Sequence, residues 1–208
     1  MSDPLPGRAV VVMGLMGAGK TTVARGLAQR WGRQLRDSDA DLLARTGRTA
    51  RELADQRGAD GLHELEAEQL LDALAAVPVP VIAAAASVVE AARCRDALQD
   101  RTVVVVWLDA PVDDLVARQA IGRYRPVYDP DLKAMLTRMD AVRRPLFAQV
   151  ADVTVHLAPI APGAPIDPVA PQDQAADRPI DPAAHDASIR ALVDDVEARL
   201  VAFAQGTS

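Results

Sequence analysis

Residues 14–22, GLMGAGKTT, contain the residue types that hold a phosphate chain. Gly14, Gly19, Lys20 and Thr21 fit the pattern G-x-x-x-x-G-K-S/T, in which glycines let successive backbone N–H groups face phosphate oxygens. The lysine reaches the outer phosphates, and the threonine hydroxyl binds Mg²⁺. The alternative is a glycine turn that binds nothing, but the flanking apolar patterns favour a phosphate loop. The residues expected to contact a nucleotide are Gly14, Met16, Gly17, Ala18, Gly19, Lys20, Thr21 and Thr22.

Lysine is rare in this chain, since only Lys20 and Lys133 are lysines among its 23 basic residues. A lysine inside a glycine loop therefore indicates a position that needs a compact ammonium group. The loop alone does not define a reaction, because motors, GTP switches, nucleotide kinases and small-molecule kinases all use one. The chain is short for a motor and contains no obvious guanine-reading motif.

The elements that must position this loop follow from the spacing of apolar residues. The β-branched run at Ala9–Met13 predicts a strand, and Val23, Ala24, Leu27 and Trp31 recur at helical spacing after the loop. The sequence therefore predicts the order strand, loop, helix that a phosphate loop requires.

The next segment predicts a second short strand and two helices. Thr49 followed by Glu52 is a capping box that opens a short helix ending at Gly58. A longer helix is expected over about residues 61–76, which stops before VPVP.

The second half of the chain continues to alternate strands with helices. Residues 102–108, TVVVVWL, are typical of a strand buried on both faces. Ser87 and Glu90 are spaced to cap a helix, and Pro111 is expected to begin another one. This alternation predicts an α/β fold with a mostly parallel central sheet flanked by helices. The other expected features are a strand over residues 79–84, Asp109 or Ala110 as the cap before Pro111, a helix ending near Arg144, a strand over residues 153–156 and a helix over residues 186–204.

Composition narrows the class of protein. The 208 residues are 50% hydrophobic, which suits one compact domain. No apolar run approaches the roughly 20 residues of a membrane span, and residues 1–10 lack a signal-peptide pattern, so a cytoplasmic location is expected. Cys94 is the only cysteine, which excludes an internal disulfide and a cysteine-based zinc site.

The charge is unevenly distributed along the chain. Residues 1–150 carry 20 basic and 20 acidic side chains, whereas residues 151–208 carry 3 and 9. A neutral body with an acidic tail argues against nucleic-acid or membrane-surface binding. We expect a monomer or weak homo-oligomer that binds small molecules. Residues 158–185 contain seven of the fifteen prolines and predict an acidic, mobile or extended insertion.

Three blocks together resemble the shikimate kinase family: residues 14–70, RQAIGRYRPV and RRPLFAQVAD. The resemblance covers most of residues 8–155. It implies a three-layer P-loop kinase with a mobile lid, which transfers the γ-phosphate of ATP to a hydroxyl of a small polar metabolite with Mg²⁺ present. The expected organisation is a core over residues 1–157 with a family-like lid at about 120–131, the proline-rich insertion at 158–185, and a helix within 186–208 that packs on the core.

Two acidic residues follow the second expected strand, at the edge of a parallel sheet where ligands collect. By the resemblance, Asp37 supports the Mg²⁺ that Thr21 binds, while Asp39 holds and deprotonates the acceptor hydroxyl. A carboxylate beside an alcohol can orient it and accept its proton. The alternative is an acidic first turn of a helix, which is favourable to the helix dipole.

Two arginines match family positions on the nucleotide side. Arg125 is similar to the lid arginine that closes over the transferring phosphate, and Arg118 to an arginine lying against adenine. A planar guanidinium can pair with phosphate oxygens or stack on a base. The alternative is a solvated arginine cluster on a loop.

The acceptor side departs from the family pattern. His63 stands where the family has an arginine that binds the shikimate carboxylate, and Ala84, Ala85 and Ala86 occupy three glycine positions. Alanine would be disfavoured at positive φ, and its methyl group would reshape the wall. A small-residue run that lets a strand and a helix pack closely is the alternative. Arg143 still matches the second carboxylate-binding arginine, and Glu66 matches an acidic residue that supports the site.

These departures leave shikimate as one candidate acceptor among small hydroxylated metabolites. One alternative is a catalytically inactive nucleotide-binding homologue with a regulatory or interaction role. A nucleoside monophosphate kinase is less favoured, since no second basic set is placed for an acceptor phosphate.

Overall fold

A computed structural model describes residues 3–121, 131–159 and 182–206. Its centre is one five-stranded sheet in which every pairing is parallel, in the order β2-β3-β1-β4-β5. This confirms the α/β fold with a mostly parallel sheet. The strands are β1 (Ala9–Met13), β2 (Leu35–Asp37), β3 (Val81–Ala83), β4 (Val103–Asp109) and β5 (Val153–His156).

Strand β1 lies in the middle of the sheet, where all five of its residues are buried. Val10 pairs with Val81 on one side and with Val104 on the other. Continuous apolar runs suit this position because strands of a parallel sheet are covered on both faces. The loop that follows β1 therefore leaves the sheet at its centre.

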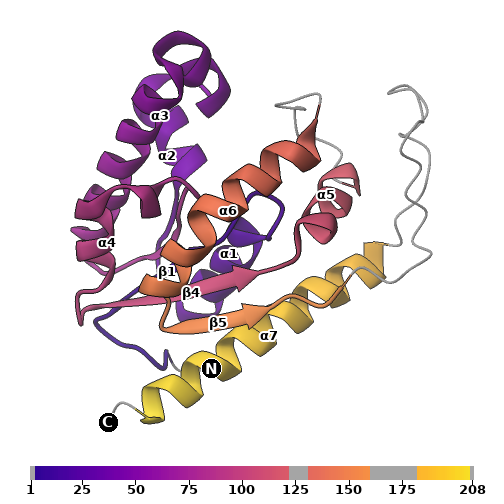
Figure 1. Ribbon diagram of the computed structural model, residues 1–208. Coiled ribbons are helices and arrows are strands. Elements are labelled where there is room, and N and C mark those ends of the chain that lie inside the picture. Colours follow the sequence, from indigo (N-terminus) through magenta and orange to yellow (C-terminus); the bar gives the residue numbers. More distant parts are fainter. Residues whose placement is uncertain (1–2, 122–130, 160–181, 207–208) are drawn as a thin grey trace.

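Helices cover the sheet and extend beyond it (Figure 1). In this view α6 crosses in front of the strands, α1 lies behind them, and α2 and α3 project from the upper left. The helical elements are α1 (Lys20–Trp31), α2 (Ser38–Thr46), α3 (Ala50–Leu74), the 3-10 turn η1 (Val88–Glu90), α4 (Ala92–Leu98), α5 (Val112–Ile121), α6 (Leu132–Val150) and α7 (Pro182–Gly206).

Helix α3 begins with the predicted capping box. The Thr49 N–H donates to Glu52 Oε2 over 2.7 Å, and the Glu52 N–H donates to Thr49 Oγ1 over 3.3 Å. Gly58 has φ 73° and ψ 174°, so α3 consists of two helical segments that meet at a kink. The predicted end of the short helix coincides with this kink, since glycine adopts positive φ without a steric penalty.

Several predicted helix boundaries were wrong. Ser87 makes no side-chain cap, and α4 begins only at Ala92, after η1. Helix α5 begins at Val112, one residue after Pro111, and Asp109 belongs to β4. Helix α6 continues past Arg144 through Pro145 to Val150, because buried residues of its last turns, Phe147 and Val150, hold it against the core despite the lost N–H donor.

Helix α7 packs against α1, and it begins at Pro182 rather than at the predicted residue 186. A Cβ added at Gly26 of α1 would come within 2.7 Å of Val193, so only glycine allows this close approach. The carboxylate of Glu197 accepts hydrogen bonds from Arg30 and from the Trp31 indole N–H. Glu197 is buried and satisfied, so α7 is joined to α1 by polar as well as apolar contacts.

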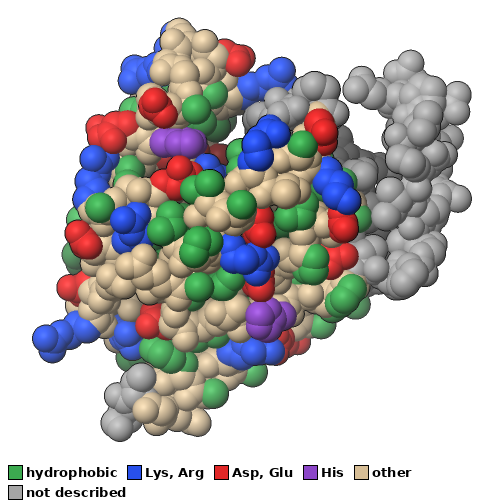
Figure 2. Space-filling view, viewed as in Figure 1, with side chains coloured by type: hydrophobic (Ala, Val, Ile, Leu, Met, Phe, Trp, Pro, Cys, Tyr) green, Lys and Arg blue, Asp and Glu red, His purple; other side chains and the backbone are tan. Residues whose placement is uncertain are grey.

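Basic and acidic side chains are interspersed over the face drawn in Figure 2. This mixed surface agrees with the balanced charge of residues 1–150 and gives this face no basic footprint for a nucleic acid. Within the described residues, no helix combines the length and the apolar character that a bilayer crossing requires.

Candidate active site

The loop between β1 and α1 has the backbone of a phosphate-binding loop. Gly14 has φ 142°, and a Cβ there would lie 2.5 Å from the Leu108 carbonyl oxygen. Gly19 has φ 86° and precedes the first residue of α1, where no side chain caps the helix. The first backbone N–H groups of α1 are therefore available to bind an anion, which the positive end of the helix dipole also attracts.

The side chains after the loop meet the end of β2. Thr21 Oγ1 donates to Asp37 Oδ2 over 2.6 Å, while Lys20 Nζ contacts the Leu15 carbonyl oxygen over 3.3 Å. Asp37 is also the N-cap of α2, since its Oδ1 accepts from the Ala40 N–H over 3.3 Å. Two segments 16 residues apart thus place a hydroxyl and a carboxylate together beside the loop.

This pair of oxygen ligands fits Mg²⁺. A magnesium site uses one or two protein oxygens and leaves its other positions to water and substrate phosphates. Among the described residues there is no cluster of three or more acidic, histidine or cysteine side chains that would form an all-protein metal site. The arrangement at Thr21 and Asp37 therefore suits a nucleotide-bound Mg²⁺ better than a permanently held ion.

Asp39 lies in the first turn of α2 and is exposed. Its negative charge helps to raise the pKa of Glu66, so the two carboxyl groups lie within electrostatic range. Asp39 thus occupies an acidic first helical turn and also lies within electrostatic range of Glu66, so the two sequence interpretations are compatible.

Glu66 lies within electrostatic range of Lys20 in the phosphate loop and of the predicted acceptor residues Asp39 and Arg143. This side chain of α3 is buried and accepts a short hydrogen bond from Ser87 Oγ. Burial raises the pKa of Glu66, and Asp39 raises it further, while the Ser87 hydrogen bond and the charges of Arg143 and Lys20 lower it. Glu66 therefore lies among Lys20, Asp39 and Arg143, which the sequence assigned to one site.

The raised pKa of Glu66 predicts a pH-dependent effect of Glu66→Gln. The folded state binds this proton more tightly than the unfolded chain does, so Glu66 favours folding at acidic pH and loses that contribution as pH rises through its folded pKa. Glutamine does not titrate and can still accept from Ser87. The Tm of Glu66→Gln minus that of wild type should therefore increase from pH 5 to pH 8 in thermal unfolding.

A suitable control is Glu68→Gln, because Glu68 lies on the same helix but is exposed and pairs with Arg45. This variant should show no comparable trend. A difference between Glu66→Gln and wild type that stays constant with pH would contradict the burial argument.

The other acceptor residues predicted from the sequence lie around Arg143. Arg143 is buried on α6, and its Nε donates to Glu90 Oε1 over 2.6 Å. Burial lowers the pKa of His63 below its ordinary value, and Arg143 lowers it further, while Glu90 and Asp60 act in the opposite direction. The structure thus brings His63, Arg143 and Glu66 into one region and adds Glu90, which was not predicted as a site residue.

The alanine run follows β3, as predicted, but the expectation that these alanines adopt a costly positive φ was wrong. The expectation that their methyl groups reshape the wall of the acceptor site stays a prediction. No described residue other than glycine has positive φ, so Ala84, Ala85 and Ala86 adopt ordinary backbone conformations. The Ala84 N–H donates to the Val12 carbonyl oxygen over 3.0 Å, which continues the pairing with β1. The three methyl groups therefore line this segment without backbone strain.

Of the two arginines assigned to the nucleotide side, the structure describes only Arg118. Arg118, on α5, donates from Nη2 to the Ala158 carbonyl oxygen over 2.9 Å, and its buried Nε has no partner. Arg118 thereby connects α5 with the segment that follows β5. Arg125 and most of the predicted lid lie outside the described residues.

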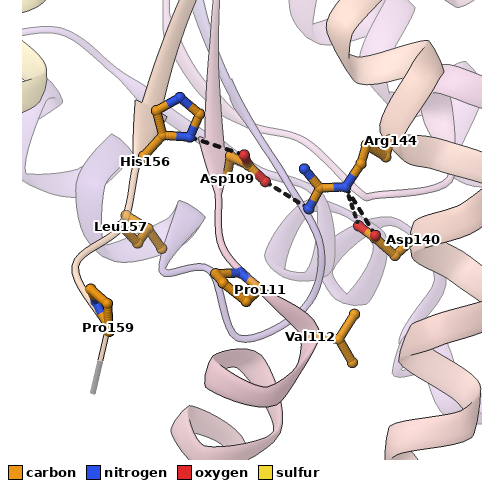
Figure 3. A pocket seen from close by; sticks show the side chains of 8 residues that line it. All are labelled: Asp109, Pro111, Val112, Asp140, Arg144, His156, Leu157 and Pro159. Carbon is orange, nitrogen blue, oxygen red and sulfur yellow. Dashed lines mark hydrogen bonds and ion pairs between the residues drawn. The ribbon is translucent and has the colours of Figure 1, made fainter. Parts of the chain in front are cut away.

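A hollow of about 490 Å³ opens at the carboxyl ends of β4 and β5 (Figure 3). Asp109 accepts from Arg144 over 2.9 Å and from His156 over 3.0 Å, while Asp140 pairs with Arg144 on its other side. Because its carboxylate pairs with these two side chains from later parts of the chain, Asp109 does not cap α5. The hollow is lined by Asp109, Pro111, Val112, Asp140, Arg144, His156, Leu157 and Pro159.

Comparison with known proteins identifies close relatives of this chain. A family model described as shikimate kinase matches residues 16–162. The shikimate kinase of Psychrobacter arcticus is 37% identical over 154 residues, which cover 74% of this chain and 81% of the relative. That of Symbiobacterium thermophilum is 39% identical over 149 residues, which cover 70% and 84%. The solved shikimate kinase from Acinetobacter baumannii in complex with shikimate has a TM-score of 0.64 and 29% identity, covering 73% of this chain and 84% of that one.

Proposed function

The chain belongs to the shikimate kinase family, and we propose that it uses the site around Lys20, Asp37 and Asp39 to phosphorylate a small polar metabolite. Family membership makes it an ATP-dependent small-molecule phosphotransferase. The observation that carries the site assignment is the Thr21–Asp37 contact beside the phosphate loop, with Asp39 and Glu66 in electrostatic range of each other.

On the nucleotide side, the N–H groups of the loop and the start of α1 bind the phosphates of ATP, and Lys20 reaches the outer ones. Thr21 and Asp37 hold Mg²⁺, which when bound neutralises phosphate charge during transfer. Arg118 is assigned to the adenine and Arg125, in the lid at about residues 120–131, to the transferring phosphate. Loop residues Met16, Gly17, Ala18 and Thr22 complete the contacts with ATP.

On the acceptor side, Asp39 orients the substrate hydroxyl. The hydroxyl oxygen attacks the γ-phosphorus while the bond from that phosphorus to the β–γ bridging oxygen breaks. The proton of the hydroxyl passes to the Asp39 carboxylate, and the products are ADP and a phosphate monoester. The other residues assigned to the acceptor are His63, Ala84, Ala85, Ala86 and Arg143.

The solved relative from Acinetobacter baumannii is in complex with shikimate, a molecule with ring hydroxyls and a carboxylate. A similar ring acceptor is therefore the first choice for this chain. Shikimate itself loses one predicted partner, because His63 replaces an arginine. Truncating one partner of a buried charge pair costs roughly 2–5 kcal/mol, enough to weaken binding substantially.

The direct test is phosphoryl transfer by the purified protein. ATP, Mg²⁺ and a panel of hydroxy acids, cyclitols and sugars should give acceptor-dependent release of ADP with at least one acceptor. The product should carry the phosphate as a monoester, which ³¹P NMR detects. ATP binding without transfer to any member of the panel would refute this proposal and favour an inactive homologue.

A further inference from the structure

We propose that an internal ion pair between Glu90 and Arg143 makes this enzyme select an uncharged polyhydroxylated acceptor and reject the same molecule bearing a carboxylate. This inference rests on the proposed function, because it concerns the acceptor end of the same site. It assigns a specificity-determining role to Glu90.

Arg143 has very little access to solvent. Its side chain is 8% exposed, and its Nε donates to Glu90 Oε1 over 2.6 Å. A buried guanidinium needs a hydrogen-bonded counter-charge, and Glu90 supplies one from within the chain. A carboxylate on the acceptor would have to displace Glu90 or lie beside a second negative charge.

No second cation replaces the engaged one among the described residues assigned to the acceptor. His63 is the other basic side chain assigned to the acceptor, but burial and Arg143 lower its pKa below the ordinary 6.5, so it is mainly neutral at pH 7. Lys20 lies within electrostatic range of Glu66, but it belongs to the phosphate loop. In the part of the chain that the structure describes, both of these cations already have a role: Arg143 pairs with Glu90, and Lys20 belongs to the phosphate loop.

The remaining polar groups favour hydroxyl donors. Asp39 and Glu66 lie within electrostatic range of each other, and Glu90 holds a carboxylate at Arg143. Carboxylates and a neutral imidazole accept hydrogen bonds from hydroxyl groups. A neutral polyol satisfies these acceptors without adding a negative charge, whereas an anionic acceptor adds repulsion.

Selectivity between charged and uncharged acceptors depends on whether an acceptor carboxylate can displace Glu90 from Arg143. Glu90 lies at the end of η1, and its side chain is 36% exposed, so the glutamate can reach solvent. If it left Arg143 readily, a ligand carboxylate would take its place and the site would accept hydroxy acids. We expect Glu90 to stay, because its 2.6 Å contact gives the buried Arg143 a counter-charge that is tethered to the same chain and needs no binding step.

A matched pair of probes isolates the carboxylate. Shikimate and its methyl ester have the same ring hydroxyls and differ mainly in charge. Calorimetric titration in the presence of ADP and Mg²⁺ should show that wild type binds the ester at least about tenfold more tightly than the acid. Glu90→Gln keeps an oxygen acceptor for Arg143 but removes the charge, so it should reverse or abolish this preference.

Glu64→Gln is the matched control, since Glu64 is exposed on α3 and pairs with Arg93 at the surface. It should retain the wild-type preference. Thermal unfolding of each variant shows whether the fold is kept, and Glu90→Ala provides a second variant if the glutamine fails to fold.

Two outcomes overturn this inference: wild type binds shikimate as tightly as the ester, or neither Glu90 variant changes the ratio of the two affinities. Failure of the proposed function gives a different result, namely intact nucleotide binding with no phosphate transfer to any acceptor in the panel. Binding and transfer are measured separately, so the two failures are distinguishable.

Discussion

Lys20→Ala should reduce kcat by at least about 10²- to 10³-fold, which leaves little or no turnover. Lys20 is the first residue of α1 and comes directly after Gly19, which has a left-handed backbone conformation. From this position its ammonium group can reach the outer phosphates of a bound nucleotide. Alanine removes the charge that stabilises the transferring phosphoryl group. Thermal unfolding shows whether the fold survives the loss of the 3.3 Å hydrogen bond from Nζ to the Leu15 carbonyl oxygen.

The chain supplies a matched control in Lys133→Ala, because Lys133 is the only other lysine. Lys133 is exposed at the start of α6 and pairs with Asp113. Its removal should leave turnover near the wild-type value. ADP release with the best acceptor of the panel and thermal unfolding should be measured for both variants. If Lys20→Ala keeps kcat within tenfold of wild type, Lys20 does not act on the transferring phosphate.

The phosphate loop was predictable because its requirements are local. Gly14 and Gly19 have the positive φ that the pattern implies, and α1 begins at Lys20. The strands were predictable for a similar reason, since buried parallel strands need continuous apolar runs. Strand β5 was predicted to the residue, while β3 proved shorter than the predicted run.

Capping boxes show where sequence reasoning fails. Thr49 and Glu52 form one, whereas Ser87 and Glu90 have the same spacing but do not. The Ser87 hydroxyl is used by the buried Glu66, which lies 21 residues away in sequence, and Glu90 is used by Arg143, 53 residues away. A local pattern does not reveal such long-range partners, so the pairing of Glu90 with Arg143 was missed.

The same limit applies to Asp109 and to the alanine run. Asp109 was predicted as a candidate cap, but it pairs with Arg144 and His156, which come from later parts of the chain. The backbone of Ala84 follows from pairing with β1 and not from the glycines that other family members place there. Residue types alone therefore indicated that the predicted acceptor site differs from the family pattern. They did not indicate its backbone conformation or its charge pairing.

Asp39→Asn should reduce kcat by about 10²- to 10⁴-fold while changing the Kd for ATP by less than about threefold. Asparagine has nearly the same shape and still forms hydrogen bonds, but it does not take up the proton of the acceptor hydroxyl. Asp37 caps α2 and contacts Thr21, so the proposed Mg²⁺ ligands remain in place. Steady-state kinetics and calorimetry with ATP separate the two effects.

Asp41→Asn is the control that removes the same charge from the same helical turn. The Asp41 carboxylate accepts from Arg36 and Gln69, so its loss should lower Tm with little effect on kcat. Because both substitutions remove an acidic charge from the first turn of α2, a loss of kcat confined to Asp39→Asn can be assigned to the reacting hydroxyl. Equal losses of turnover and ATP affinity in Asp39→Asn would instead place Asp39 on the nucleotide side, and the acceptor would then need a different base.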